Sequence, residues 1–359
     1  MSSTIGKTLK ISIFGESHGN AIGVVIDAIP AGEKIDLEAL QKFLNRRAPG
    51  RLEYQTPRHE SDIPEFVSGL LENTTTGAPI CAIIRNENTS SKDYESFRTM
   101  PRPSHADYPA QLRYQGFNDI RGGGHFSGRL TAPLCVAGGL VLQILARRGI
   151  TVGAHIASIG SVCDTPLDPV GISAEELRRL TEKTVPVLND NAGKEMVKMV
   201  EAARDSGDSV GGIIECAVVG YPGGIGAPMF EGLENRLAST IFGIPAVRGV
   251  EFGAGFASAS MNGSVHNDAY TVVDGKIMTK TNNHGGIIGG ISTGMPIMLR
   301  VAIKPTPSIG QEQSTVDISC MKEVSLKIKG RHDPCIVPRA VACVEAAVGI
   351  VLLDMLLCE

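Results

Sequence analysis

The chain has 359 residues, of which 42% are hydrophobic, and a net charge of −4. It is long enough to bury a large core, in one large domain or in two smaller ones. The small negative charge excludes a broad basic surface for nucleic acid or an anionic membrane, so any anion site has to come from a local cluster of arginines.

The composition indicates a cytoplasmic protein. The eight cysteines form no CxxC pair and several lie in apolar runs, which is typical of reduced, buried thiols rather than of a disulfide or zinc framework. The first residues contain no apolar segment, so we expect no signal peptide. The long apolar run 336–358 is interrupted by Arg339, Glu345 and Asp354. We therefore predict a buried or subunit-facing helix there and no membrane span.

Apolar periodicity and breaker residues predict strands and helices along the whole chain. Asp36 is the expected N-cap of a helix that ends at Arg46-Arg47, and Ser173 with Glu176 forms a capping box for a later one. The predicted strands are 9–14, 21–29, 80–84, 151–160, 213–219, 295–303 and 323–329. The other predicted helices are 134–148, 192–206, 231–241 and one that begins near 338. Long loops are expected at 102–129 and 253–270. Mixed connections and segregated helices indicate the α+β class rather than a doubly wound sheet.

Three motifs recur in the same order, which indicates an internal duplication. Gly15-Glu-Ser-His-Gly19 and Gly207-Asp-Ser-Val-Gly211 are each followed by a proline, fifteen residues after the first glycine. Thr76-Gly-Ala-Pro-Ile80 matches Thr293-Gly-Met-Pro-Ile297, and an Arg/His loop precedes an apolar helix twice. We predict a single domain, 1–359, whose halves at about 1–150 and 195–359 share one core. Chance similarity of Gly/Pro-rich strand ends is the alternative.

One stretch of the chain concentrates charged and imidazole side chains around glycines. It consists of Arg102-Pro-Ser-His-Ala-Asp-Tyr108 and Arg121-Gly-Gly-Gly-His-Phe-Ser-Gly-Arg129. With little apolar periodicity, it is expected to be a loop that a scaffold holds in place. Arginines and imidazoles that converge in this way can bind phosphate or carboxylate groups and move protons. A solvated basic loop is the alternative.

Further polar residues lie at predicted strand and helix ends. The candidate imidazoles are His18, His105, His125 and His332, and the candidate cations are Arg47, Arg102, Arg129 and Arg331. Arg47 also has an ordinary explanation, since arginines in a last turn complement the helix dipole. The sequence has no metal-ligand spacing and no Rossmann or Walker motif, so no metal is expected. The residues alone predict an enzyme for a small phosphorylated or multiply anionic substrate.

In combination, these motifs resemble the chorismate synthase family. The matching segments are Phe14-Gly-Glu-Ser-His-Gly19, Arg102–Tyr108, Asp119-Ile-Arg-Gly-Gly-Gly124, Lys304-Pro-Thr306 and Gly330-Arg-His-Asp-Pro-Cys335. The resemblance implies the anti-1,4-elimination of phosphate from 5-enolpyruvylshikimate 3-phosphate to give chorismate. It further implies a need for reduced FMN without net redox change, and a homotetramer with a β-α-β sandwich core that contains an internal duplication.

The resemblance also implies roles for individual residues. His18, with Ser17 beside it, would be the general acid at the leaving phosphate, His105 would maintain the protonation state of the flavin, and Asp333 would assist removal of the ring hydrogen. The substrate would be held by Arg47, Arg102, Ser127, Arg129 and Arg331. The flavin would be held by His125, Phe126, Ser127, Pro245, Ala246, Gly289, Lys304, Pro305, Thr306, Pro307, Ser308 and Arg331. Either NADPH or an external flavin reductase would reduce it.

Two positions depart from the family pattern. Glu53 stands where the family commonly has a basic residue, which Arg51 could replace, and His125-Phe126 stands where many members have Arg-Ser. Two other functions remain as alternatives. One is a flavin-independent phosphatase or phosphotransferase, and the other is a catalytically silent flavin-binding protein.

Overall fold

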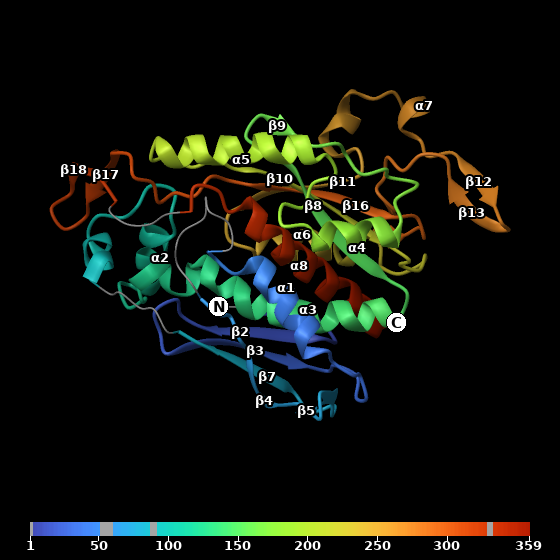
Figure 1. Cartoon of the computed structure of the whole chain (residues 1–359), viewed down its shortest axis with the longest axis horizontal. Coiled ribbons are helices and arrows are strands. Elements are labelled where there is room, and N and C mark those ends of the chain that lie inside the picture. The colour runs from blue at the N-terminus through green and yellow to red at the C-terminus, as the bar shows by residue number, and fades with distance from the viewer. Residues whose placement is uncertain (1–2, 51–59, 87–91, 329–332) are drawn as a thin grey trace.

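Two antiparallel sheets enclose a layer of helices, so the chain forms a β-α-β sandwich of the α+β class, as predicted (Figure 1). The computed structural model describes residues 3–50, 60–86, 92–328 and 333–359. The first sheet has the order β1 (Thr4–Ile5), β2 (Lys10–Gly15), β3 (Ala21–Asp27), β7 (Ile80–Arg85), β4 (Glu65–Ser68). The second has the order β11 (Val247–Phe252), β16 (Ile297–Ile303), β10 (Gly212–Val219), β8 (Thr151–Ile159), β9 (Val162–Cys163).

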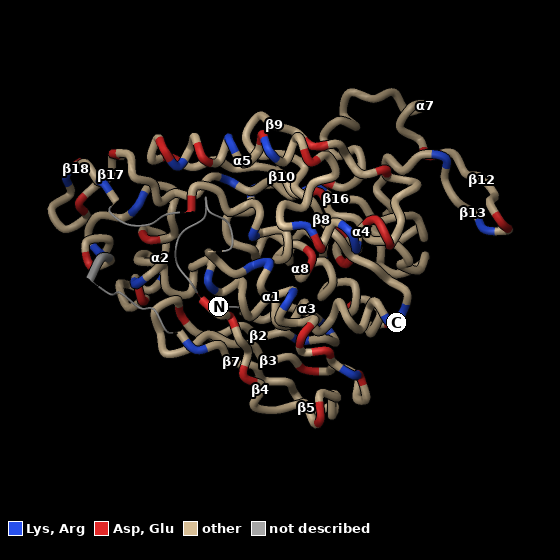
Figure 2. The backbone as a smooth tube through the Cα atoms, viewed as in Figure 1, with Lys and Arg blue, Asp and Glu red and all other residues tan. Residues whose placement is uncertain are grey.

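Each sheet turns an apolar face toward the helices. In β3 the alternate residues Ile22, Val24 and Ile26 are fully buried, as the two-residue period of a strand requires. The helices between the sheets are α1 (Leu37–Arg47), α3 (Thr131–Arg147), α6 (Leu233–Phe242) and α8 (Val337–Cys358). Most of α3 and α8 is free of charged residues (Figure 2). They therefore supply the apolar middle layer of the core.

The helices α3 and α8 pack closely against each other. A Cβ at Gly138 would lie 2.2 Å from the Cβ of Ala346, so this glycine permits the close approach of the two helices. By composition the stretches Gly128–Arg147 and Val337–Cys358 are apolar enough to cross a membrane, but 83% of each apolar window is buried inside the protein. Of the two predictions for the last helix, burial is the one that the structure supports.

The remaining elements lie outside this sandwich. The helices α4 (Ala174–Glu182) and α5 (Asp190–Asp205) pack against β8, and Ser173 caps α4 as predicted. Small hairpins are formed by β5 (Leu70–Leu71) with β6 (Thr74–Thr75), β12 (Tyr270–Val273) with β13 (Lys276–Thr279), β14 (Ile287–Ile288) with β15 (Ile291–Ser292), and β17 (Gln313–Asp317) with β18 (Lys322–Leu326).

The two predicted long loops are wrong in part, because both contain short helices. The first contains α2 (Asp107–Tyr114) and the 3-10 helices η2 (Arg121–Phe126) and η3 (Gly128–Leu130), and the second contains η5 (Gly255–Ser260) and α7 (Gly263–His266). The other 3-10 helices are η1 (Lys92–Arg98) and η4 (Met229–Glu231). None of these segments is long enough to show a helical period in the sequence.

The two sheets have the same strand connectivity. The order β2-β3-β7-β4 corresponds to β8-β10-β16-β11, α1 follows β3 as α6 follows β10, and α3 and α8 come last in each set. Each of these two last helices packs on the sheet of its own set, α3 on β3 and α8 on β8 and β10.

Candidate active site

A cavity of about 900 Å³ brings most of the predicted site residues together. On its wall lie Arg47, Arg102, His105, His125, Phe126, Ser127, Arg129, Pro245, Ala246, Lys304, Thr306, Pro307, Ser308 and Asp333. Ser17, His18 and Pro305 are not wall residues, and neither is Gly289, which lies between β14 and β15. Arg331, His332, Arg51 and Glu53 lie outside the described residues.

The buried carboxylate of Asp62 joins two of the predicted arginines. It accepts a hydrogen bond from Nη1 of Arg47, at the end of α1, and another from Nη1 of Arg129, in η3. Glu60 forms a second ion pair with Arg129, at 2.8 Å. Burial opposes the charge of Asp62, but Arg47 and Arg129 hold the pKa of this carboxyl below its usual value. The two guanidiniums are thus fixed side by side at the cavity.

A second cluster lies at the start of α2. Arg102 donates from Nε and Nη2 to the two carboxylate oxygens of Asp107, at 2.8 Å each, and Nη1 lies 3.2 Å from Ser308 Oγ. His105 Nδ1 lies 2.6 Å from Asp107 Oδ1. Burial opposes the charge of Asp107, but the bonds from Arg102 and His105 hold its pKa well below the usual range. Most donors of Arg102 are therefore used inside the protein, where they orient Asp107.

The glycine turn 122–124 lies between the two predicted catalytic histidines. All three glycines have positive φ, at 59°, 84° and 54°. A Cβ at Gly122 would lie 2.2 Å from His18 Nδ1, and a Cβ at Gly123 would lie 3.2 Å from His105 Cε1. The backbone of the turn thus separates the two imidazoles.

His18 lies behind the cavity wall, with only 4% of its surface exposed. Ser17 Oγ lies 3.3 Å from His18 Nδ1, and the ring of Tyr94 meets the imidazole edge-on at 5.0 Å between centroids. Both Tyr94 and Gly122 line the cavity, so they stand between His18 and the cavity space.

Another part of the wall combines an aromatic ring with cations. Phe126 is partly exposed, and Lys304 and Arg248 also line the cavity. Lys304 Nζ donates to the carbonyl oxygen of Ser104 at 2.5 Å, and burial, followed by the charge of Arg248, lowers the pKa of Lys304. His125, also on the wall, makes two contacts within the protein: Nδ1 lies 2.7 Å from the carbonyl oxygen of Gly15, and Nε2 lies 2.7 Å from Ser3 Oγ.

Asp333 is tied to the first turn of α8. It forms an ion pair with Nη1 of Arg339, whose Nε donates to the carbonyl oxygen of Arg47 at 2.9 Å. Thr306 Oγ1 donates to the backbone oxygen of Asp333 at 2.8 Å, which connects the turn after β16 to the same corner. The arrangement can bind several anionic groups of one ligand and hold a proton at His105 beside them.

Sequence reasoning missed three of these residues. Arg339 carried a signal, because it interrupts an apolar helix, but it was interpreted only as evidence against a membrane span. Asp107 belonged to the recognised segment without an assigned role. Asp62 carries no local signal, since it lies 15 residues from Arg47 and 67 residues from Arg129 in the sequence.

Comparison with known proteins identifies the arrangement. The family model described as Chorismate synthase matches residues 9–357. The chain is 49% identical over 354 residues to a chorismate synthase of Pyrococcus abyssi, and 47% identical over 352 residues to one of Thermococcus kodakarensis; each alignment covers 98% of this chain and 97% of the relative. A crystal structure of chorismate synthase superposes with a TM-score of 0.76 at 25% identity, covering 98% of this chain and 93% of that one.

Proposed function

The chain belongs to the chorismate synthase family, and on this premise we propose that its cavity carries out the anti-1,4-elimination of phosphate from 5-enolpyruvylshikimate 3-phosphate, a lyase reaction that yields chorismate. The chain thus functions in the shikimate pathway. The observation that carries the proposal is the joint presence on one wall of Arg47, Arg129 and His105. A substrate with one phosphate and two carboxylates needs several fixed cations, and the elimination needs groups that hold and move protons.

We assign substrate binding chiefly to Arg47 and Arg129, with Ser127 beside them on the wall. Asp62 fixes both guanidiniums before any ligand arrives, so little side-chain ordering remains to be done on binding. Substrate binding by Arg331 and Arg102 stays a prediction. The Nε and Nη2 groups of Arg102 already donate to Asp107, so these donors are unavailable for the substrate. Arg339 is a further cation on the same wall.

We assign proton handling to His18, His105 and Asp333. Asp107 orients the imidazole of His105 through Nδ1, which leaves Nε2 to hold or release a proton on the side of the glycine turn. His18, with Ser17, would protonate the leaving phosphate, and its place behind Gly122 and Tyr94 keeps it close to the wall. Asp333 would assist removal of the ring hydrogen, and its ion pair with Arg339 holds its carboxylate at this corner of the cavity.

The residues present fit a reduced FMN cofactor, which we propose as part of this site. The cavity is at the upper end of the range of about 300–1,000 Å³ for ligand pockets, and so has room for a ring system beside the substrate. Phe126, Pro245 and Ala246 offer apolar contacts, and Lys304 with Ser308 offers donors for a phosphate group. When bound, reduced flavin supplies a transient electron to the reaction without net redox change. Gly289 and Pro305 keep their predicted flavin contacts as proposals.

The decisive experiment is an anaerobic assay in which the protein is mixed with 5-enolpyruvylshikimate 3-phosphate and dithionite-reduced FMN, and phosphate and chorismate are measured together. The proposal predicts equal amounts of both products, and none when only the flavin is left out. Replacing dithionite with NADPH distinguishes intrinsic reduction of the flavin from dependence on an external reductase. Phosphate release without flavin would instead favour a phosphatase, and flavin binding without any product would favour a silent binding protein.

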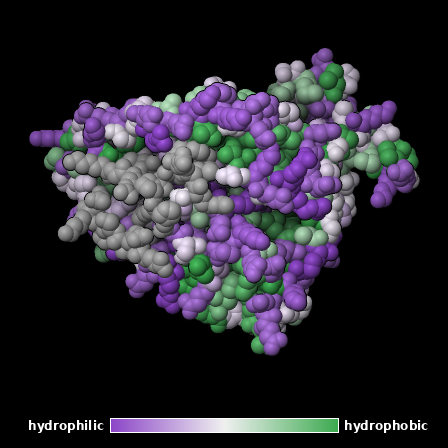
Figure 3. Space-filling model, in the orientation of Figure 1, coloured by the Kyte–Doolittle hydropathy of each residue, from purple (hydrophilic) through white to green (hydrophobic). Residues whose placement is uncertain are grey.

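We propose that the protein is a cytoplasmic homotetramer. All eight cysteines are free, which fits a reducing compartment. The hairpin β12–β13 projects from the body beside α7, and large apolar side chains gather there (Figures 1 and 3). Tyr270, Ile277 and Phe256 are 70%, 74% and 87% exposed. Such a patch is typical of a subunit interface.

Light scattering of size-separated protein tests the assembly. Ile277→Glu is expected to lower the measured molar mass below that of a tetramer, because the new charge in the patch opposes association of the subunits. Leu71→Glu is the matched control, since Leu71 is 69% exposed on β5, outside the patch. An unchanged molar mass for Ile277→Glu would show that the subunit interface lies elsewhere on the protein.

We also propose that the fold arose by internal duplication within one domain, 1–359. The equal strand connectivity of the two sheets supports this proposal beyond the short sequence motifs. The counterpart of β2 in this scheme is β8 (Thr151–Ile159), so the second half would begin nearer to residue 151 than to residue 195.

A further inference from the structure

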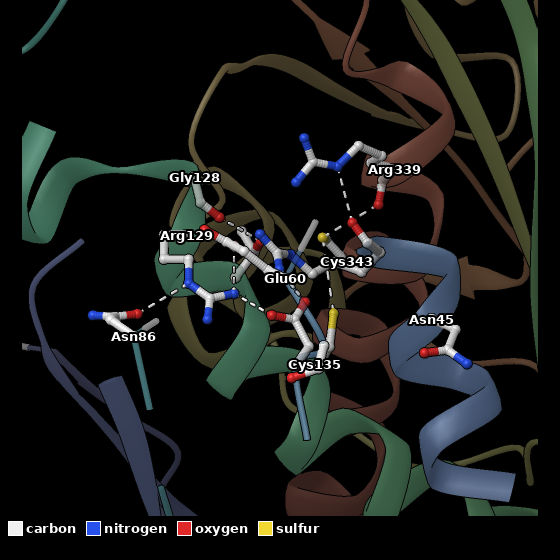
Figure 4. Close-up of polar contacts among 12 residues, drawn as sticks. Asn45, Glu60, Asn86, Gly128, Arg129, Cys135, Arg339 and Cys343 are labelled. Atoms are coloured by element: carbon white, nitrogen blue, oxygen red, sulfur yellow. Dashed lines mark hydrogen bonds and ion pairs between the residues drawn. The ribbon is translucent and has the colours of Figure 1, made fainter. Parts of the chain in front are cut away.

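The part of the cavity wall that α8 contributes carries a cysteine for which the elimination has no use. Cys343 lines the cavity, although only 3% of its surface is exposed. Its Sγ donates to the carbonyl oxygen of Arg339, one turn earlier in the helix, at 3.5 Å (Figure 4). Arg47 and Thr131 also lie close to this sulfur. A small molecule that enters the cavity can therefore meet this sulfur beside two guanidinium groups.

A second cysteine lies directly behind the first. Cys135, in the second turn of α3, is fully buried and is not a wall residue. Its Sγ lies 3.8 Å from Sγ of Cys343, and the two sulfurs point toward each other across the contact between α3 and α8 (Figure 4). A disulfide needs about 2.05 Å between the sulfurs, so the two sulfurs, which already face each other, have to come closer for the bond to form.

The surroundings of the two thiols give them different chemistry. The hydrogen bond from Cys135 lowers the pKa of Cys343 to about 7; burial opposes this shift, while Arg47, Thr131 and Arg339 favour it. Burial raises the pKa of Cys135 well above the usual value. Cys343 is therefore the more acidic of the two thiols, and it is also the one that lines the cavity.

We propose that Cys343 and Cys135 form a two-cysteine oxidation site, in which Cys343 reacts with a small peroxide that enters through the active-site cavity and Cys135 then closes a disulfide between α8 and α3. The site is distinct in chemistry from the elimination, and needs neither flavin nor the substrate. It goes beyond the proposed function and does not rest on it.

The reaction balances with hydrogen peroxide as the only oxidant. The Cys343 thiolate attacks one peroxide oxygen, the O–O bond breaks, and the departing hydroxide takes up a proton to become water. Cys343 now carries a sulfenic acid. The sulfur of Cys135 then attacks the sulfur of Cys343, and the hydroxide that leaves combines with the Cys135 proton to form a second water. Two thiols are oxidised by two electrons and one peroxide is reduced to two waters.

Two other buried cysteines provide internal controls. Cys216 is fully buried and Cys335 nearly so, and neither lines the cavity. Burial raises the pKa of Cys216 well above the usual value and that of Cys335 to about 12. Both should therefore react with peroxide at least about 10-fold more slowly than Cys343, because the thiolate is the nucleophile.

The test uses the full chain in which the exposed cysteines Cys163, Cys320 and Cys358 are replaced by serine. The folded protein is treated with hydrogen peroxide, alkylated and digested without reduction, and the linked peptides are identified by mass spectrometry. We expect one link, between Cys135 and Cys343, which dithiothreitol reverses. Inorganic phosphate should slow its formation several-fold, because an anion held by Arg47 or Arg339 covers the sulfur.

Variants separate the two steps. Cys135→Ser should leave Cys343 as a sulfenic acid that a dimedone probe captures, Cys343→Ser should leave Cys135 unreacted, and Cys216→Ser should form the link at the unchanged rate. The proposal is overturned if Cys343 stays reduced while the chain remains folded. Over-oxidation of Cys343 in the presence of an intact Cys135 overturns it too, because Cys135 would then not be the resolving thiol.

Discussion

His105 and Asp107 are joined by a hydrogen bond of 2.6 Å between Nδ1 and Oδ1 at the start of α2. The carboxylate of Asp107 also holds Arg102 through both of its oxygens. One carboxylate therefore orients both an imidazole and a guanidinium, and Nη2 of Arg102 also lies 3.1 Å from Nδ1 of His105. The geometry makes Asp107 a positioning residue for His105.

The first prediction follows from this bond. Asp107→Asn should lower kcat by about 100-fold, the lower end of what general acid–base groups contribute, with little change in KM. The assay is the anaerobic one with reduced FMN, and Asp190→Asn, which alters an exposed carboxylate paired with Lys183, is the matched control. An unchanged kcat with a raised KM would assign Asp107 to substrate binding instead.

The second prediction concerns Asp62, which is buried between Arg47 and Arg129. Asp62→Asn should lower the free energy of unfolding by about 3 kcal/mol, because it leaves two buried guanidiniums without their shared partner. Urea denaturation measures the loss. Glu65→Gln, which breaks an exposed ion pair with Arg85, should cost less than about 1 kcal/mol. Equal costs for the two variants would show that the arginines find other partners.

The main elements of the sandwich could be predicted from the sequence because each carries its own local signal. The strand β2 alternates, β3 is an apolar run closed by Pro30, Asp36 caps α1 through Ala39 N, and α3 ends before Gly149. The edge strands β4 and β11 were missed because they lie at sheet edges, are short, and are at most partly buried along most of their length, so the apolar alternation is weak.

The site was predictable only where its residues share a motif. The glycine turn and Arg102–Tyr108 are each a continuous stretch of sequence, and the structure places residues of both at the cavity. Asp62 and Cys343 are set by tertiary packing: one reaches Arg129 across 67 residues of sequence, and the other reaches Cys135 across 208. No local sequence pattern predicts contacts between residues so far apart. A buried cysteine in an apolar helix cannot be distinguished by its sequence context from an ordinary core residue.

The third prediction is a pH dependence that arises from His155. This fully buried imidazole lies between Asp164 and Glu215, at 3.0 and 2.9 Å. Burial opposes protonation, but the hydrogen bonds to both carboxylates raise the pKa of His155. Because the pKa of His155 is higher in the folded state than in the unfolded state, its protonation stabilises the fold. This stabilisation is complete at pH values below the unfolded-state pKa of about 6.5, and it is lost as the pH rises through the folded-state pKa.

His155→Gln tests this dependence. The difference in the free energy of unfolding between the parent and the variant should be largest near pH 6 and should shrink as the pH is raised toward 9, as followed by urea denaturation. His266→Gln, in the partly exposed region around α7, is the control for the effect of a His-to-Gln substitution itself. A difference that grows with pH would mean that His155 is neutral in the folded protein.

The last prediction separates the two consequences of a side chain at Gly122. Its φ of 59° is strained for alanine, and the new Cβ would lie 2.2 Å from Nδ1 of His18. Gly122→Ala should therefore cost about 1–2 kcal/mol of stability and also reduce kcat at least about 10-fold by displacing the imidazole. Gly116→Ala is the matched control, because Gly116 has a φ of 81° and no atom within 4 Å of the added Cβ. It should show a similar loss of stability in urea while the elimination rate stays near that of the parent. If both variants keep the parent rate, the position of His18 against the glycine turn does not matter for the reaction, and His18 cannot be its general acid in this geometry.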